Sequence, residues 1–207
     1  YDIYRHDYGE YTTGSTSVRK TSNSGATTLF DSNFYVLSSA RNVYKCLDNN
    51  GGATSTDEPT GVSTSVITTT DSYKWKFMYT LSAAQQANFL STDFMAVSPN
   101  SNPSSDQSNV MSAAVDGAID IVKIKSAGSG GTAGTFTNIP IRGDGSGGLA
   151  TVVVAGGLVT SVTVTTPGTG YTFGTISNAQ IVAAGATNLA GAELDVIIPP
   201  KGGHGAN

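Results

Sequence analysis

Two neighbouring runs of apolar and aromatic residues lie in the first quarter of the chain. The runs Phe34–Ser38 and Val43–Leu47 have the composition that is typical of β-strands. A short polar connection through Arg41 and Asn42 separates them. The pattern therefore predicts a β-hairpin. Asn and Gly tolerate left-handed backbone angles, so we expect a turn in the run Asp48–Gly52 that follows.

A heavier apolar pattern begins at Trp75. Large apolar residues occupy every second position there: Trp75, Phe77, Tyr79 and Leu81. This spacing predicts a strand with all four side chains on one face, in a core or in an interface. Ser82 then precedes Gln85 by three residues, which is the spacing of a helix capping box. We expect a short helix over 83–90, and it is the one helix that the sequence predicts.

An internal repeat follows a polar linker at 98–105. Residues 117–141 match residues 157–181 at a constant offset, and each unit contains a Gly-x-Gly. The pattern predicts a strand, a turn and a second short strand in each unit. Gly130 and Gly170 should occupy matching turn positions with positive φ. Because two copies are too few for a solenoid, we predict a small β-sandwich or barrel.

These elements give a mainly β fold with two regions. Residues 1–111 are predicted to form a mixed β-sheet core with one short helix, completed by 199–207. Residues 112–198 are predicted to form a glycine-rich, β-sandwich-like domain built from the two-fold internal repeat. Its last strand is expected over 194–198, before two prolines stop it.

Composition supports this fold class and narrows the partners. Only 13% of the residues are charged, and Gly, Ser, Thr and Asn fill the difference, as expected for an all-β protein. The net charge of −4 and the pI near 4.9 argue against nucleic acid as a partner, because there is no basic stripe to contact phosphates. No apolar run is long enough for a membrane helix, so we expect no membrane partner. The chain begins at Tyr1 without a Met, and we expect it to be a piece of a longer protein.

Few residues in the sequence have the spacing of a catalytic or metal site. The two histidines, His6 and His204, lie at opposite ends of the chain without neighbouring ligands, which disfavours zinc. Ser146 lies in a Gly-rich run with no helix after it, so a tight turn is favoured over a nucleophile elbow. Asp144 has no second carboxylate nearby for calcium. Cys46 is expected to be a small buried apolar residue. We therefore predict no catalytic residue, no cofactor and no metal, and hence not an enzyme.

Several segments together resemble one known protein family. They are Tyr4–Tyr8, Phe34–Val36, Asn42–Asn50, Glu58–Gly61, Tyr73–Thr80 and Pro199–Gly205. In this order they are similar to the baseplate wedge protein (gene-eight product) family of T-even-like contractile-tailed phages. The resemblance covers mainly 1–97 and 196–207, and the glycine-rich region between them matches that family poorly.

The resemblance implies a structural role in the virion. It implies a mostly β wedge component of the phage tail baseplate that contacts other baseplate wedge proteins, forms a homodimer in the full-length parent, and carries no catalytic residues. The candidate interface or motif residues are Tyr44, Lys45, Trp75, Tyr79, Gly202, Gly203 and His204. The three glycines Gly202, Gly203 and Gly205 would be permissive positions of a close-packed loop.

Two other functional classes remain open at this point. A carbohydrate-binding or host-adhesion module of a phage tail is also β-rich and low in charge, and an exposed, coplanar aromatic pair would favour it. Burial of Trp75 would instead favour the wedge interpretation. A cell-wall hydrolase would need a converging pair of acids or a metal centre, which the sequence does not indicate.

Overall fold

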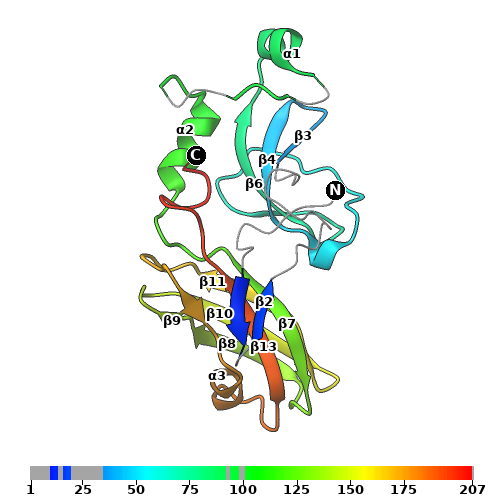
Figure 1. Ribbon diagram of the computed structural model, residues 1–207, viewed down its shortest axis with the longest axis vertical. Helices are drawn as coiled ribbons and strands as arrows, with labels where there is room; N and C mark the ends of the chain where they lie inside the picture. The colour runs from blue at the N-terminus through cyan, green and yellow to red at the C-terminus, as the bar shows by residue number, and fades with distance from the viewer. Residues whose placement is uncertain (1–9, 14–15, 20–34, 92–93, 98–100, 207) are drawn as a thin grey trace. The chain divides into compact units, whose positions relative to one another are not determined.

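The computed structural model describes residues 10–13, 16–19, 35–91, 94–97 and 101–206 (Figure 1). It is mainly β, with 39% strand and 15% helix, which confirms the predicted fold class. The strands are β1 (Glu10–Thr13), β2 (Thr16–Arg19), β3 (Tyr35–Leu37), β4 (Asn42–Asp48), β5 (Ile67–Thr68), β6 (Lys74–Thr80), β7 (Ile121–Ser129), β8 (Gly134–Pro140), β9 (Arg142–Gly143), β10 (Leu149–Ala155), β11 (Leu158–Thr166), β12 (Gly174–Thr175) and β13 (Ala190–Ile197). The helices are α1 (Ala83–Phe89), α2 (Ser105–Ala113), α3 (Asn178–Ala183) and the 3-10 turn η1 (Asn50–Gly52).

The chain divides into two compact units. The first unit comprises residues 1–113 together with 205–207, and the second comprises residues 114–204. The division between the units falls between residues 113 and 114, two residues after the predicted division between 111 and 112. Two of the family-like segments, Tyr4–Tyr8 and part of Phe34–Val36, lie outside the described residues, as does His6.

A four-stranded antiparallel sheet in the order β3-β4-β6-β5 forms the centre of the first unit. The predicted hairpin is confirmed, because β3 pairs with β4 through Tyr35 and Lys45. Its turn has Arg41 at φ 65° and a hydrogen bond from the Arg41 amide to the Ser38 carbonyl of 2.9 Å. The predicted turn after β4 is also confirmed, since Asn50 and the two residues after it all have positive φ.

The strand predicted at Trp75 is present as β6, but its apolar residues do not share one face. Tyr44 lies opposite Phe77, while Val43 lies opposite Tyr79, so a bulge at Met78 interrupts the register. Residues directly opposite each other on paired strands have their side chains on the same face of the sheet, and successive residues of one strand point to opposite faces. Phe77 and Tyr79 therefore lie on opposite faces, and the single-face prediction is wrong because the bulge reverses the alternation.

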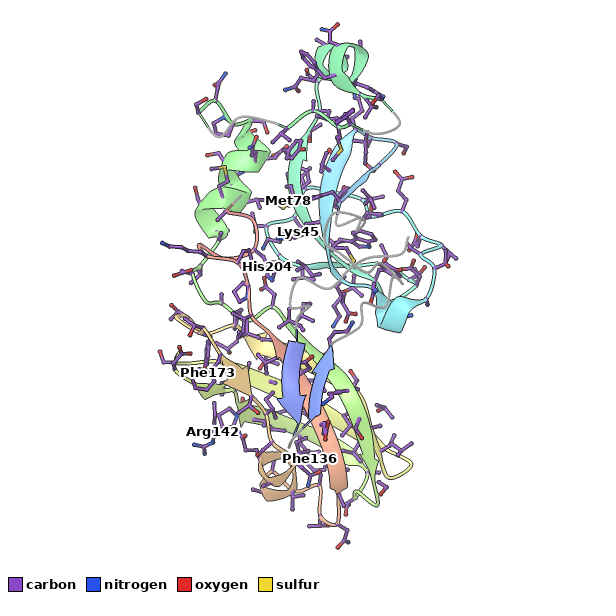
Figure 2. The ribbon with its side chains drawn as sticks, in the orientation of Figure 1. Lys45, Met78, Phe136, Arg142, Phe173 and His204 are labelled. Atoms are coloured by element: carbon purple, nitrogen blue, oxygen red, sulfur yellow. The ribbon has the colours of Figure 1, made fainter. Side chains whose placement is uncertain are left out.

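The two faces of the sheet carry separate apolar clusters. The cluster that we call the aromatic face comprises Val36, Tyr44, Cys46, Tyr73, Trp75 and Phe77, with Val110 of α2 packed on it. The opposite cluster comprises Val43, Met78, Tyr79 and Leu81. Cys46 is buried, as expected. Figure 2 labels Lys45 and Met78 on this sheet.

The described residues contain three α-helices, whereas the sequence predicts one. The predicted helix is confirmed as α1, with the capping box in place: the Gln85 amide donates to Ser82 Oγ at 3.1 Å, and the Ser82 amide donates to Gln85 Oε1 at 2.8 Å. Helix α2 starts inside the stretch interpreted as a linker, and α3 replaces an expected strand.

The second unit packs its strands around one core. A three-stranded sheet has the order β11-β10-β8, and β7 pairs with β13 beside it. Both contribute to a cluster that includes Val122, Ile139, Val152, Val162 and Val196, which α3 joins through Ile181. The expected last strand is present as β13, although it begins earlier, at Ala190.

The two copies of the predicted repeat share only their first half. Gly128 and Gly168 have φ of 68° and 66°, and Gly130 and Gly170 have φ of 76° and 74°, so the turns match as predicted. The segments then diverge, because residues 134–140 form one strand paired with β10, whereas 174–183 form the two-residue β12 and helix α3. The internal repeat is therefore not confirmed.

Candidate functional site

Four of the predicted site residues lie in the central sheet of the first unit. Tyr44 and Trp75 are 0% exposed and Tyr79 is 9% exposed, whereas Lys45 is partly exposed. The Tyr44 hydroxyl donates to the Gly61 carbonyl at 2.7 Å, and the Tyr79 hydroxyl donates to the Ala96 carbonyl at 2.9 Å. Burial raises the pKa of both phenols. The side chains of Tyr44, Trp75 and Tyr79 therefore stabilise the interior of the unit, and a partner protein could not contact them directly.

The aromatic face is built around a stacked pair. The rings of Tyr73 and Trp75 lie 5.4 Å apart with an angle of 19° between their planes, and both side chains are 0% exposed. Trp75 Nε1 donates to Thr69 Oγ1 at 3.2 Å, so the indole N–H is satisfied in the interior. A coplanar aromatic pair is present, but it is not accessible for stacking on a ligand.

A loop of residues 53–64, which we call the cover loop, is tied to this sheet along its whole length. It includes the family-like Glu58–Gly61. Tyr73 donates to the Ala53 carbonyl, Tyr44 to the Gly61 carbonyl, and Lys76 Nζ to the Thr64 carbonyl at 2.7 Å. The cover loop is short of apolar residues, so hydrogen bonds to the sheet determine its position.

Asp71, in the turn between β5 and β6, is the main anchor of the cover loop, a role that is not among those predicted from the sequence. Its Oδ2 accepts from Ser55 Oγ at 2.7 Å, the Thr56 amide at 2.9 Å and the Asp57 amide at 3.1 Å, while its Oδ1 accepts from Thr69 Oγ1 at 2.5 Å and the Tyr73 amide at 3.2 Å. The last of these contacts is an Asx turn, a local structure that Asp itself favours. The contacts to the cover loop lie too far away in sequence to be signalled in this way.

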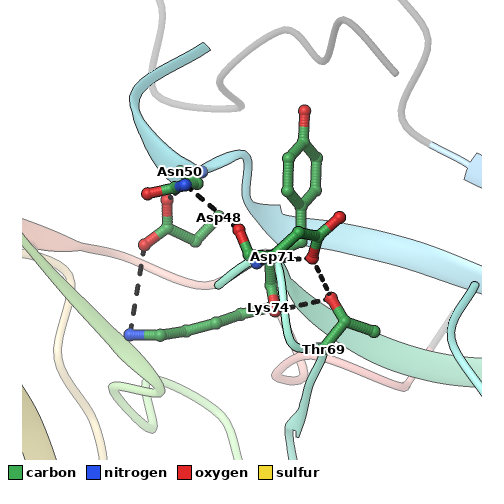
Figure 3. A network of polar contacts seen from close by, with 6 residues as sticks. Asp48, Asn50, Thr69, Asp71 and Lys74 are labelled. Carbon is green, nitrogen blue, oxygen red and sulfur yellow. Dashed lines mark hydrogen bonds and ion pairs between the residues drawn. The ribbon is translucent and has the colours of Figure 1, made fainter. Parts of the chain in front are cut away.

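The end of β4 is connected to the same turn (Figure 3). Asn50 Nδ2 donates to the Asp71 carbonyl at 3.1 Å, and the Asn50 amide donates to Asp48 Oδ1 at 3.1 Å. Lys74 Nζ lies 4.0 Å from Asp48 Oδ2. Two family-like segments, Asn42–Asn50 and Tyr73–Thr80, are thus joined by polar contacts as well as by strand pairing.

We expect Asp71→Asn to lower the free energy of unfolding of the first unit by about 2 kcal/mol at pH 7, because an amide NH₂ group would face donors. Burial raises the pKa of Asp71, but the hydrogen bonds from Thr69, Ser55, Thr56 and Tyr73 outweigh it and leave the pKa well below its usual value. The contribution is therefore complete above the unfolded pKa of about 3.9 and is lost as the pH falls through the folded pKa. The difference between wild type and variant should narrow below about pH 4.

Urea unfolding followed by the fluorescence of Trp75, the one tryptophan of the chain, measures this effect in the first unit. Asp106→Asn on α2 removes the same charge away from the cover loop and should cost less than about 1 kcal/mol. Equal stability of Asp71→Asn and wild type, or a difference that stays constant down to pH 2.5, would contradict the assigned role.

Lys45 differs from the other site residues in the sheet. It lies directly opposite Lys76 on β6 and Tyr35 on β3. Burial lowers the pKa of the Lys45 ammonium. Like charges directly opposite one another destabilise a sheet. The positive charge of Lys45, opposite that of Lys76, therefore lowers the stability of the first unit.

The Gly-rich run of the second unit forms interlocked turns. Ser146 and Thr169 exchange backbone hydrogen bonds of 3.0 Å in both directions. Asp144 accepts from the Thr172 hydroxyl, from the Thr172 amide at 2.9 Å and from the Phe173 amide at 3.1 Å. The Thr172 side chain and these amides lower the pKa of Asp144 to about 2. Both Ser146 and Asp144 therefore have structural roles in a turn.

The remaining site residues lie in the loop after β13. Gly202 and Gly203 have φ of 91° and 93°, and the Gly202 amide donates to Asp116 Oδ1 at 2.6 Å. A Cβ at Gly203 would lie 2.3 Å from the Val115 carbonyl oxygen, so the loop is close-packed. His204 is only 3% exposed. The sequence suggests the backbone conformation correctly, while an interface role for these residues stays a prediction.

Two features of the first unit face solvent. Phe89, Phe94 and Val97, close together in sequence, are 64%, 75% and 77% exposed, and no residue of α1 is buried. A cavity of about 220 Å³ lies between residues 36–38 at the end of β3, residues 55–59 of the cover loop, and Trp75.

The described residues contain neither a metal-binding cluster nor a membrane-spanning helix. Within the described residues, no group of three or more His, Cys, Asp or Glu side chains is placed to hold a metal ion. Among the described helices, none has the length and apolar character needed to cross a membrane. No family model, curated protein or solved structure matches the chain.

Proposed function

We propose that this chain is a structural component of a phage tail baseplate wedge and acts through protein–protein assembly contacts. The observation that carries the proposal is the convergence of the family-like segments in the first unit. Asn42–Asn50 and Tyr73–Thr80 form the paired strands β4 and β6, and Glu58–Gly61 is bound to them through Tyr44. The residues behind the resemblance therefore work as one packed unit, as expected if they came from a common fold.

The end of the last family-like segment meets the same unit. A Cβ at Gly205 would lie 2.7 Å from Val110 Cγ1 and 3.1 Å from Lys76 Cε, so this glycine packs between α2 and β6. Family-like residues far apart in the sequence, at Lys76 and Gly205, are thus in contact. The contact supports the proposal, because segments that resemble one family are expected to pack together if they belong to one fold.

The exposed apolar side chains give the proposed assembly contacts a physical basis. Phe89, Phe94 and Val97 expose most of their surface. Interface cores are depleted in charge and enriched in aromatic residues. The sequence from Ser82 to Val97 contains one charged residue, Asp93. We propose this segment as a contact surface with other baseplate wedge proteins, in a parent that the resemblance implies to be a homodimer located in the virion.

The alternative, a carbohydrate-binding or host-adhesion module, has less support. It needs an accessible aromatic platform, and both Tyr73 and Trp75 are fully buried. A catalytic role has no support from the anchored carboxylates of Asp71 and Asp144, whose oxygens are occupied by turn contacts.

Co-expression of the full-length parent with the other baseplate wedge proteins of the same virus tests the proposal. We expect a stable complex that co-purifies through a tag on the parent alone, and no hydrolysis of polysaccharide, peptide or phosphoester. Glycan hydrolysis abolished by a single Asp or Glu substitution would overturn the proposal.

A further inference from the structure

The cover loop contributes little apolar packing to the first unit. The structure describes every residue of this loop, and Pro59 alone among them is buried. Val62, the other large apolar residue of the loop, is 40% exposed. Because burial of apolar surface is the main stabilising term of a fold, the loop depends on polar contacts for its position.

Two neighbouring carboxylates of the loop bind turns at opposite ends of the sheet. Asp57 Oδ2 accepts from the Thr70 amide at 2.8 Å and the Thr70 hydroxyl at 2.9 Å, in the turn between β5 and β6. Glu58 Oε1 accepts from the Ser39 amide at 2.6 Å and the Ser39 hydroxyl at 2.8 Å, in the turn between β3 and β4. The loop is therefore a strap that is fastened at both turns.

The fastening at the turn between β5 and β6 is reciprocal. Asp57 binds Thr70 of the turn. Asp71 of the turn accepts from Ser55 Oγ and from the amides of Thr56 and Asp57. A carboxylate on each side is thus bonded to donors on the other side, and displacement of either side breaks both sets of bonds. We therefore expect the loop to leave the sheet as one cooperative unit.

Trp75, beneath the loop, is held in place by the sheet. It pairs with Cys46 of β4 and Ile67 of β5, and its indole donates to Thr69, which lies outside the loop. Residues 55–59 line one side of the cavity of about 220 Å³, and Trp75 lines another. Groups that face each other across a gap lose dispersion attraction. The loop thus covers Trp75 without packing tightly on it.

We propose that the cover loop opens as one unit and uncovers the stacked pair of Tyr73 and Trp75 while the sheet beneath it stays folded. Segments with few buried apolar contacts and exposed backbone hydrogen bonds open at lower free energy than core strands. The hydrogen bonds of the Ser39, Thr56 and Thr70 amides are all exposed. The first unit then has a polar surface when the loop is closed and an aromatic one when it is open. Such opening does not depend on a partner in an assembly.

Amide hydrogen exchange measured by NMR, at rising urea concentrations below the unfolding transition, tests the opening. We expect the protection of the Ser39, Thr56 and Thr70 amides to change little with urea, because local opening exposes little surface. Protection across β4 and β6 should fall as urea rises. Loop contacts that follow the urea dependence of the sheet would overturn the proposal. Amides without any protection would also overturn it, because the loop would then not be closed in solution.

Asp57→Asn tests whether the loop opens as one unit. The substitution weakens the bonds to Thr70 and leaves Asp71, the acceptor of the Thr56 amide, unchanged. We expect exchange of the Thr56 and Thr70 amides to accelerate together by about tenfold, as for the loss of one charge-assisted hydrogen bond. Asp106→Asn on α2 is the matched charge control and should leave both rates at the wild-type level. Faster exchange of Thr70 alone would show that the contacts break independently, against the proposal.

Acrylamide quenching of the fluorescence of Trp75, the one tryptophan of the chain, tests what the loop covers. The double variant Asp57→Asn, Asp71→Asn weakens both sides of the reciprocal fastening. We expect its quenching to rise toward that of the urea-unfolded chain while its far-UV circular dichroism spectrum stays that of the wild type. Loss of loop protection without a rise in quenching would show that the loop does not cover Trp75. A rise in quenching together with loss of the spectrum would show that the sheet opens with the loop. Either result contradicts the proposal.

Discussion

Trp75→Ala is expected to destabilise the first unit by about 3–5 kcal/mol, because it removes the largest fully buried side chain of the aromatic face. The indole stacks on Tyr73 and donates to Thr69 Oγ1, so the substitution leaves a cavity and removes one of the hydrogen bonds of the Thr69 hydroxyl, which still donates to Asp71. Hydrogen exchange measured by mass spectrometry should show loss of protection across β4 and β6. Protection in the second unit should remain.

Phe94→Ala is the matched control for this substitution. It also removes an aromatic ring from the first unit, but Phe94 is 75% exposed, and the expected cost is within about 0.5 kcal/mol. If Trp75→Ala keeps wild-type protection and loses tight glycan binding, the aromatic pair would be a ligand platform. The adhesion interpretation would then replace the assembly one.

Gly117→Ala is expected to destabilise the second unit by on the order of 3 kcal/mol. Gly117 has φ 66°, and a Cβ there would lie 2.2 Å from the Tyr171 amide nitrogen and 2.6 Å from the Gly170 carbonyl carbon. These are backbone atoms held by the hydrogen bond from the Tyr171 amide to the Gly117 carbonyl, so they cannot move aside without breaking the turn. Hydrogen exchange over 117–176 measures the loss.

Gly191→Ala separates the cost of a positive φ from the cost of the steric clash at Gly117. Gly191 has φ 72°, but its Cβ position has no atom within 4 Å, so only the conformational cost of about 1 kcal/mol applies. Equal losses in Gly117→Ala and Gly191→Ala would show that close packing around Gly117 contributes nothing. The second unit would then be more adaptable than its contacts imply.

The sequence predicted local structure well where the determinants are local. The β3–β4 hairpin follows from two β-type runs around a polar connection, and α1 follows from the Ser82 and Gln85 capping pair. The same pair begins the two unexpected helices. Gln180 donates its amide to Ser177 Oγ at 3.3 Å, and Gln107 donates to Ser104 Oγ at 3.3 Å. The Ser-x-x-Gln spacing of a capping box is present at both sites. The sequence prediction placed Ser177 and Gln180 in a repeat strand, and Ser104 at the end of a linker, so neither helix was expected.

Other features depend on contacts between distant residues and could not be predicted. The bulge at Met78 is a property of the pairing between β4 and β6, and nothing in the alternation of β6 marks it. The two Gly-x-Gly turns adopt the same backbone angles, yet the segments after them diverge because their pairing partners differ. The role of Asp71 depends on Ser55–Asp57, which lie at least 14 residues away.

The buried positions of Tyr44, Trp75 and Tyr79 also change where the functional surface is to be sought. Sequence motifs marked these residues because the fold needs them, and such residues lie in the core. Among the large apolar side chains of the first unit that the structure describes, Phe89, Phe94 and Val97 are the most exposed, and they are where we propose the partner surface.

The mass of the complex formed by the full-length parent tests the proposed assembly role. The parent, co-expressed with the other baseplate wedge proteins and purified through its own tag, can be measured by size-exclusion chromatography with light scattering. We predict one peak whose mass equals two copies of the parent plus bound wedge proteins, consistent with interfaces that bury on the order of 1,200–2,000 Å² or more. A parent that elutes without any wedge protein, at every ionic strength tried, would contradict the assembly role.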